Sequence, residues 1–205
     1  ITNRLVGSEM CIRDRAYRVH YFHNSILISG LSEDASDFIL VKMDLEGNVI
    51  WEQAYGGNSD DHCFGMDVND NGEIFLAGHT LSGTANWDTY TIKIDFDGEI
   101  LWERIIGNPR GFDPEYIHDE AWGIRATDDG GCVTIAGTGD EYEEYSECYG
   151  EECSDIWRAY LIKFDEGGQV EWERIFSPLE ISEDNYDWAG EDIDLTDDGL
   201  SLIHI

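Results

Sequence analysis

Apolar residues along this chain fall into short runs in which apolar and polar positions alternate, and Gly, Asp and Asn separate the runs. Such alternation is typical of half-buried antiparallel strands, and no stretch has the periodicity of an amphipathic helix. In the middle of the chain the pattern predicts strands over about 62–68, 73–78, 88–95 and 99–106. Asn and Gly tolerate a positive φ, so residues 70–72 (Asp-Asn-Gly) and 96–98 (Phe-Asp-Gly) predict tight hairpin turns.

The same pattern recurs three times. KMDLEGNVIWEQAYG starts at residue 42, KIDFDGEILWERIIG at 93 and KFDEGGQVEWERIFS at 163. A second set of matches, HNSILISG (23–30), DNGEIFLAG (70–78) and DGGCVTIAG (129–137), keeps the same order, as does a third, FGMDV, WGIRA and EDIDL. The conserved positions of the repeated hairpin are Lys42, Trp51, Lys93, Trp102, Lys163 and Trp172. The first two lysines are 51 residues apart and the next two are 70 apart, which indicates an insertion within the third copy.

A four-stranded unit of this length cannot bury both faces of its sheet alone, so equivalent units must stack, and radial stacking produces a β-propeller. The sequence therefore predicts an all-β fold, a β-propeller fragment of about three four-stranded blades plus the first strand of a fourth. The predicted blades are 16–55, 62–106 and 120–176, with a partial blade at 189–199. We expect each Trp to fill the space between neighbouring blades, with the paired Lys over its indole as a cation–π contact.

The pattern K-x-D-x-x-G-x-x-x-W followed by D-G-G-x-x-x-x-x-G resembles the repeat of secreted bacterial β-propeller proteins, and it covers nearly all of 16–199. That resemblance implies an extracellular or cell-surface module for binding or scaffolding, without a common enzymatic activity. Asp44, Gly47 and Trp51 are also similar to the tryptophan motif of quinoprotein-like propellers, although the turn is one residue shorter. An adjacent-cysteine pair, a quinone-binding set and the sialidase aspartate box are absent from the sequence.

Both ends of the chain differ from its acidic, repetitive middle. Residues 200–205 (LSLIHI) can be encoded by CTG TCT CTT ATA CAC ATC. The reverse complement of that DNA, read one base out of frame, encodes Met-Cys-Ile-Arg-Asp, which is residues 10–14. We therefore expect 1–15 and 200–205 to derive from a sequencing-library adapter, and 16–199 to be an internal part of a longer propeller whose remaining blades lie outside this chain.

The acidic composition of the chain limits the classes of partner that it can bind. With 12 Lys and Arg against 45 Asp and Glu, the formal net charge is −33. Nucleic acid is excluded because phosphate binding needs a basic face, and an anionic membrane would repel the chain for the same reason. The apolar runs make a packed core feasible at this length. No membrane insertion is expected, and no cofactor other than Ca²⁺.

The cysteines fall into two groups. Cys63 and Cys132 lie in apolar runs, which predicts small buried hydrophobic side chains. Cys148 and Cys153 flank Tyr-Gly-Glu-Glu in an acidic loop, a spacing that either leaves two thiols or closes a disulfide through a turn at Gly150. A bond across so short a loop would order the loop locally.

Two long insertions, 107–119 and 138–157, are expected at one end of the blades, with 177–188 beside them. Loops on a rigid scaffold are the usual place for recognition. The predicted ligand-binding residues are Tyr116, His118, Tyr142, Tyr145, Trp157 and Trp188, whose side chains suit a sugar or a peptide. The predicted Ca²⁺ ligands are Asp140, Glu141, Glu143 and Glu144. By contrast, 67–72 (DVNDNG) lacks the closing Glu of a calcium loop, since Gly78 stands there, and a β-turn explains it better.

No catalytic residue is predicted. His118 is followed by two acids in a long loop, but adjacent residues of an extended segment point to opposite faces, which prevents a ready acid–base pair. Nucleophile-elbow, zinc-protease and phosphate-loop motifs are absent from the sequence. We therefore expect a non-enzymatic extracellular module that binds a protein or a glycan. The alternative is a fragment of a propeller enzyme, a quinoprotein-like dehydrogenase or a glycan-active hydrolase, whose catalytic residues lie in missing blades.

Overall fold

A computed structural model describes residues 16–32, 36–111, 114–115, 117–139, 157–176, 189–196 and the backbone of 201–204. Within these residues the secondary structure is entirely β-strand. Sheet I contains β1 (Ala16–Phe22), β2 (Ser25–Leu31), β3 (Phe38–Asp44) and β4 (Val49–Tyr55). Sheet II contains β5 (Asp61–Val68), β6 (Ile74–Thr80), β7 (Asp88–Ile94) and β8 (Ile100–Ile106). Sheet III contains β9 (His118–Ala126), β10 (Cys132–Gly139), β11 (Arg158–Phe164) and β12 (Val170–Phe176), and β13 (Asp192–Leu195) pairs with β14 (Ser201–His204).

Each of sheets I to III is an antiparallel meander whose strands follow chain order. The prediction of an all-β fold built from three four-stranded units is therefore confirmed. The turn at 70–72 is also confirmed: the N–H of Gly72 donates to the carbonyl of Asn69 at 2.9 Å, and Gly72 has a φ of 82°. The same bond recurs between Gly98 and Asp95 at 3.1 Å, where Gly98 has a φ of 94°.

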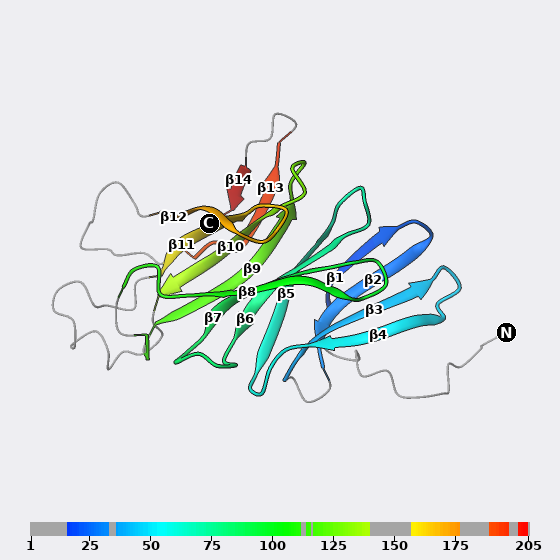
Figure 1. Ribbon diagram of the computed structural model, residues 1–205, viewed down its shortest axis with the longest axis horizontal. Helices are drawn as coiled ribbons and strands as arrows, with labels where there is room; N and C mark the ends of the chain where they lie inside the picture. The colour runs from blue at the N-terminus through cyan, green and yellow to red at the C-terminus, as the bar shows by residue number, and fades with distance from the viewer. Residues whose placement is uncertain are drawn as a thin grey trace.

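The three sheets follow one another along the long axis of the molecule (Figure 1), and the first strand of each lies nearest the next sheet. Strand β5 contacts β1 on one side and β9 on the other, and β9 contacts β13. The first strands therefore contact one another in series. The last strands, β4, β8 and β12, are largely exposed, as is β1, whereas β5 and β9 are mostly buried.

Two apolar cores hold the stack together. Sheet I faces sheet II through Leu27, Phe38 and Leu40, which pack against a matching set from β5, β6 and β7 that includes Ile92. The side chains between sheets II and III are Phe75, Ala77, Trp102, Ala121, Ile124, Cys132, Ala136, Tyr160, Ile162 and Phe164. Burying one Leu or Ile fully stabilises the folded state by about 1.5–3 kcal/mol, so stacking supplies the stability that a single sheet lacks.

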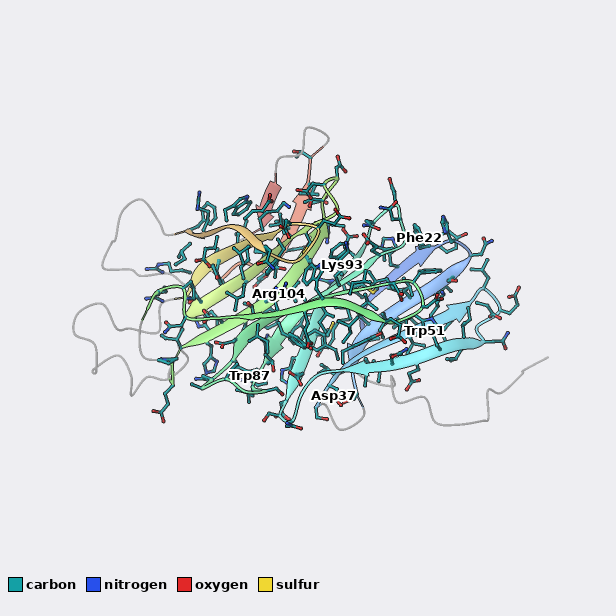
Figure 2. The ribbon with its side chains drawn as sticks, viewed as in Figure 1. Phe22, Asp37, Trp51, Trp87, Lys93 and Arg104 are labelled. Carbon is teal, nitrogen blue, oxygen red and sulfur yellow. The ribbon has the colours of Figure 1, made fainter. Side chains whose placement is uncertain are left out.

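The repeated Lys and Trp are direct cross-strand partners in all three sheets: Lys42 with Trp51, Lys93 with Trp102, and Lys163 with Trp172. Each indole packs against a core that also contains side chains of the following strands, as predicted from the repeat. Trp51 and Lys93 are labelled in Figure 2, in sheets I and II respectively.

The expected cation–π contact between the repeated Lys and its paired Trp occurs in sheet I, but not among the described contacts of sheets II and III. Lys42 Nζ lies 5.8 Å from the centroid of Trp51 but 3.3 Å from that of Phe96 in the next sheet. Lys93 instead pairs with Glu73 at 2.9 Å, and Lys163 pairs with Asp129 at 2.8 Å. The reason is that a buried ammonium is stabilised more by carboxylates and carbonyls within hydrogen-bonding reach than by an indole face.

Cys63 and Cys132 are both fully buried and unbonded, as predicted. Burial raises the pKa of the Cys63 thiol to about 12, so it behaves as a small hydrophobic side chain. Cys148 and Cys153 lie outside the described residues. Among the residues that the structure places, no helix is long and apolar enough to cross a membrane.

Candidate functional site

A β-bulge occurs in the first strand of each of the three sheets. The pairing of β1 with β2 shifts between Ala16 and Arg18, and that of β5 with β6 shifts between Cys63 and Gly65. In β9, Ala121 pairs with Ala136 of β10 and Gly123 pairs with Ile135, so the pairing skips one residue of β9. The residues left without a cross-strand partner at these shifts are Tyr17, Phe64 and Trp122. Because a bulge redirects its extra side chain, one aromatic residue per sheet is turned in an equivalent way.

These three side chains, which we call the aromatic row, contact one another across the sheet junctions. The ring centroids of Tyr17 and Phe64 are 4.6 Å apart with the planes at 60°. Those of Phe64 and Trp122 are also 4.6 Å apart, at 37°. The strands come close enough because glycine follows each of the last two rings: a Cβ on Gly65 would lie 3.1 Å from the backbone of Gly123.

The aromatic row forms one wall of a cavity of about 500 Å³, which we call the aromatic pocket. Its lining residues are Tyr17, Arg18, Phe64, Glu120, Trp122, Trp157, Ala189 and Glu191. Arg18 and Glu191 are exposed, whereas Glu120 is buried. The pocket therefore combines flat apolar surfaces with two carboxylates and one guanidinium.

Glu120 reaches the pocket because it lies two residues before Trp122 on the same strand. Its Oε1 lies 3.2 Å from Nδ1 of His118, which is two residues earlier again. Burial acts to raise the pKa of Glu120, but the hydrogen bond from His118 and the charges of nearby histidines outweigh it, and the pKa is lowered from its ordinary value. Glu120 is therefore an ionised hydrogen-bond acceptor at neutral pH.

A histidine pair supports the aromatic row from behind. His62 Nδ1 and His79 Nε2 lie 3.2 Å apart, and the His79 ring lies 5.3 Å from Phe64. The indole of Trp87, labelled in Figure 2, lies 4.6 Å from the His62 ring and 4.8 Å from the His79 ring. Burial lowers the pKa of His79 to about 4, so this ring is neutral at pH 7. The row thus rests on packed rings, of which His79 is uncharged at pH 7.

One of the ligand-binding residues predicted from the sequence lines this pocket, and a second contacts a lining residue. Trp157 lines it, directly before β11. His118 is the first residue of β9, not a loop residue, and it is only 3% exposed, with its ring edge-on to Trp157 at 6.3 Å. It contacts the pocket residue Glu120 rather than the pocket itself. The other predicted ligand-binding residues, Tyr116, Tyr142, Tyr145 and Trp188, and the predicted calcium ligands, Asp140, Glu141, Glu143 and Glu144, lie outside the described residues.

Sequence reasoning missed the aromatic row itself. A signal was present, since Phe64-Gly65 and Trp122-Gly123 occupy the same place in the repeat. An aromatic residue followed by glycine on an inner strand indicates a bulge with a close approach behind it. Tyr17 is followed by Arg18, so its membership of the row is visible only in the strand register.

No group of three His, Cys, Asp or Glu side chains suited to a metal ion occurs within the described ranges. At the opposite end of β5, Asp67, Asp70 and Asp128 line an open polar cleft. Asn69 Oδ1 there accepts the N–H groups of Asn71 and Glu73, at 3.1 and 2.9 Å. The DVNDNG stretch is therefore a hydrogen-bonded turn, as predicted.

No family model matches the sequence, and no curated protein matches it. Among solved structures, a bifunctional GH43-CE protein of Bacteroides eggerthii is similar, with a TM-score of 0.47 and 12% sequence identity. The match covers 90% of this chain and 21% of the Bacteroides protein. This chain therefore spans about a fifth of the length of that protein. Similarity at this level does not define a fold or an activity.

Proposed function

We propose that the chain forms three consecutive blades of a β-propeller, with 189–196 opening a fourth and further blades supplied by the parent protein. What supports this is the repetition of one junction. Lys42 Nζ donates to the carbonyl of Phe96 at 2.8 Å, and Lys93 Nζ lies 3.5 Å from the carbonyl of Glu166. Phe96 and Glu166 hold the same place in the last hairpin turn of successive sheets. A constant rotation between equivalent sheets builds a ring.

We infer that the module is non-enzymatic, extracellular or on the cell surface, and binds a protein or a glycan in the aromatic pocket. The single observation that carries this inference is the aromatic row, in which three sheets each direct a bulged aromatic side chain into one cavity. A large pocket with flat apolar walls and a few polar groups is the usual form of a ligand site. Trp157 places the pocket at the end of the sheets that carries the two long insertions.

The insertion between Gly139 and Trp157 is proposed to contribute further contacts to the pocket. Tyr142 and Tyr145 belong to the insertion that ends at Trp157. Asp140, Glu141, Glu143 and Glu144 belong to it too and are proposed to bind Ca²⁺, an ion that favours hard oxygen ligands. Cys148 and Cys153 would fix this insertion if they form a disulfide in an oxidising compartment.

A glycan-active hydrolase is the second candidate, because the buried Glu120 carboxylate faces the pocket. Hydrolysis of a glycosidic bond requires two carboxyl groups at a defined separation on either side of the bond. The second such group would have to come from another blade.

The test applies the purified chain to a printed glycan array and to an array of extracellular proteins, and assays soluble polysaccharides for release of reducing ends. We expect saturable binding on one of the arrays, reduced in Trp122→Ala, and no product release. Release of product would establish the hydrolase. Absence of binding on both arrays would refute the binding module.

A further inference from the structure

We propose that the ligand of the aromatic pocket is an uncharged glycan, whose pyranose rings stack on Tyr17, Phe64 and Trp122 and whose hydroxyls bind Glu120 and Glu191. This proposal rests on the binding function proposed above and specifies its ligand class. The shape of the row, the polar groups beside it and the charge around it each support the proposal.

The aromatic row is a continuous wall and not a cage. Both centroid separations along it are 4.6 Å, so the three rings touch and leave no space between them. A cage for an ammonium group needs aromatic faces on several sides of one cation. The ring planes are tilted by 60° and 37°, so the row is stepped, and a sugar ring can pack its C–H face against the free side of one ring at a time. The cavity volume of about 500 Å³ also suits a ligand larger than a single ammonium group.

The polar groups of the pocket suit hydroxyls. A carboxylate accepts hydrogen bonds through two oxygens, and a guanidinium donates through five N–H groups in one plane. Glu120, on β9, is 9% exposed, and its orientation is set by His118 at 3.2 Å. Glu191 and Arg18 are exposed and line the same cavity. A polyol that both donates and accepts can satisfy all three groups at once.

Charge argues against an anionic glycan. Two of the three charged lining residues are acidic, in a chain whose formal net charge is −33. Placing a uronate or sulfate beside Glu120 and Glu191 would bring like charges together in a partly enclosed site, which costs several kcal/mol. One exposed arginine does not offset that arrangement.

The inner strands also offer little to an extended peptide. Peptides commonly bind by adding a strand to a free sheet edge. Strands β5 and β9 instead pack against each other where Gly65 meets Gly123, with the ideal Cβ of Gly65 3.1 Å from the Gly123 backbone. A protein partner needs a broad contact of about 800 Å² per side, whereas the aromatic row lines a single cavity. A glycan chain end fits the geometry better.

The experiment compares neutral, uronic, sulfated and sialylated glycans on one array, followed by calorimetry with the best neutral oligosaccharide. Tyr17→Ala is the main variant and Tyr21→Ala its control. Both are exposed tyrosines of β1, 41% and 61% exposed, and only Tyr17 lines the pocket. We expect neutral glycans to bind, Tyr17→Ala to weaken binding about tenfold, and Tyr21→Ala to leave it unchanged. Glu120→Gln, which keeps the volume but removes the charge, should weaken binding of neutral glycans and lessen the discrimination against acidic ones.

Three results would overturn the proposal: preference for acidic glycans, no binding of any glycan, or equal effects of Tyr17→Ala and Tyr21→Ala. Binding only to the protein array, with loss in Tyr17→Ala, would refute the glycan ligand and leave the binding function standing. Absence of binding on both arrays would refute the binding function itself.

Discussion

Trp102 and Glu166 join two sheets through one hydrogen bond. The indole Nε1 of Trp102, on β8 of sheet II, donates to the backbone carbonyl of Glu166, in the last turn of sheet III, at 3.0 Å. Arg104, two residues along β8 and labelled in Figure 2, donates from Nε to the carbonyl of Gly168 in the same turn at 2.7 Å. The repeated tryptophan therefore fills the core and also fixes the position of the next sheet.

Replacing that indole tests the bond directly. We expect Trp102→Phe to lower the free energy of unfolding by about 2–3 kcal/mol, since it loses a buried hydrogen bond and part of the apolar contact. Trp51→Phe is the matched control, because Trp51 Nε1 has no hydrogen-bond partner among the described residues. It should cost about 1–2 kcal/mol from packing alone. Urea denaturation measures both, and equal losses would show that the bond to Glu166 contributes nothing.

A pair of glycines separates steric from conformational effects. Gly47 and Gly168 occupy the same position in the last turns of sheets I and III, with φ values of 85° and 76°. A Cβ on Gly168 would lie 2.6 Å from the Trp102 ring, whereas nothing lies within 4 Å of one on Gly47. Gly47→Ala should cost about 1 kcal/mol for the left-handed backbone. Gly168→Ala should cost about 1–3 kcal/mol more for the clash, as measured by thermal unfolding. Similar losses for the two variants would contradict the close packing at this junction.

Asp119 should make stability depend on pH in an unusual direction. Burial, the largest cause, raises the pKa of this carboxyl to about 6 from 3.8, and the nearby Asp88 adds to it. Between about pH 4 and 6 the folded state then binds a proton that the unfolded state has released, so this group's contribution to stability is lost as pH rises through 6.

The variant Asp119→Asn removes that proton. Its stability relative to the unchanged protein should therefore increase from pH 4 to pH 7, by roughly 1–3 kcal/mol. The Asn carbonyl can still accept the N–H of Asn108, which the Asp119 Oδ2 accepts in the protein. Denaturation series at several pH values measure the difference. A constant difference across this range would contradict a raised pKa.

Calcium is tested by thermal unfolding with added Ca²⁺ and with a chelator. If Asp140, Glu141, Glu143 and Glu144 bind the ion, stabilisation should grow with concentration, reaching about 2.7 kcal/mol at a hundredfold excess over the dissociation constant. The quadruple change of these residues to Asn and Gln should abolish the effect. A melting temperature that does not respond to Ca²⁺ removes this proposal.

Repetition made much of the fold predictable. Lys93 and Trp102 have the same spacing as the corresponding Lys and Trp of the other two copies. The sequence alone therefore predicted their pairing on adjacent strands and the position of the indole between sheets. The turn at 70–72 was equally clear, because its residue types favour positive φ whatever surrounds them. These features depend on contacts within one unit or on an interface that is copied from unit to unit.

The pocket was less accessible to sequence reasoning. The sequence predicts recognition residues mainly in loops. That prediction included Trp157, but it placed His118 in a loop and not at the start of a strand. Phe64 and Trp122 begin the repeat matches FGMDV and WGIRA, which predict a strand but not a site. They become a site because a bulge redirects them, and the occurrence of a bulge depends on how one strand registers against its neighbour.

By itself, then, the sequence determined that this chain is all-β, that it is built from equivalent four-stranded units, and which Lys and Trp residues mark their outer hairpins. These follow from alternation, turn chemistry and repetition, which are local or periodic properties. Only the tertiary structure decided that Tyr17, Phe64 and Trp122, each from a different sheet, meet beside Glu120. The physical reason is that the stacking of whole sheets sets distances between residues far apart in the chain, and no spacing along the sequence encodes those distances.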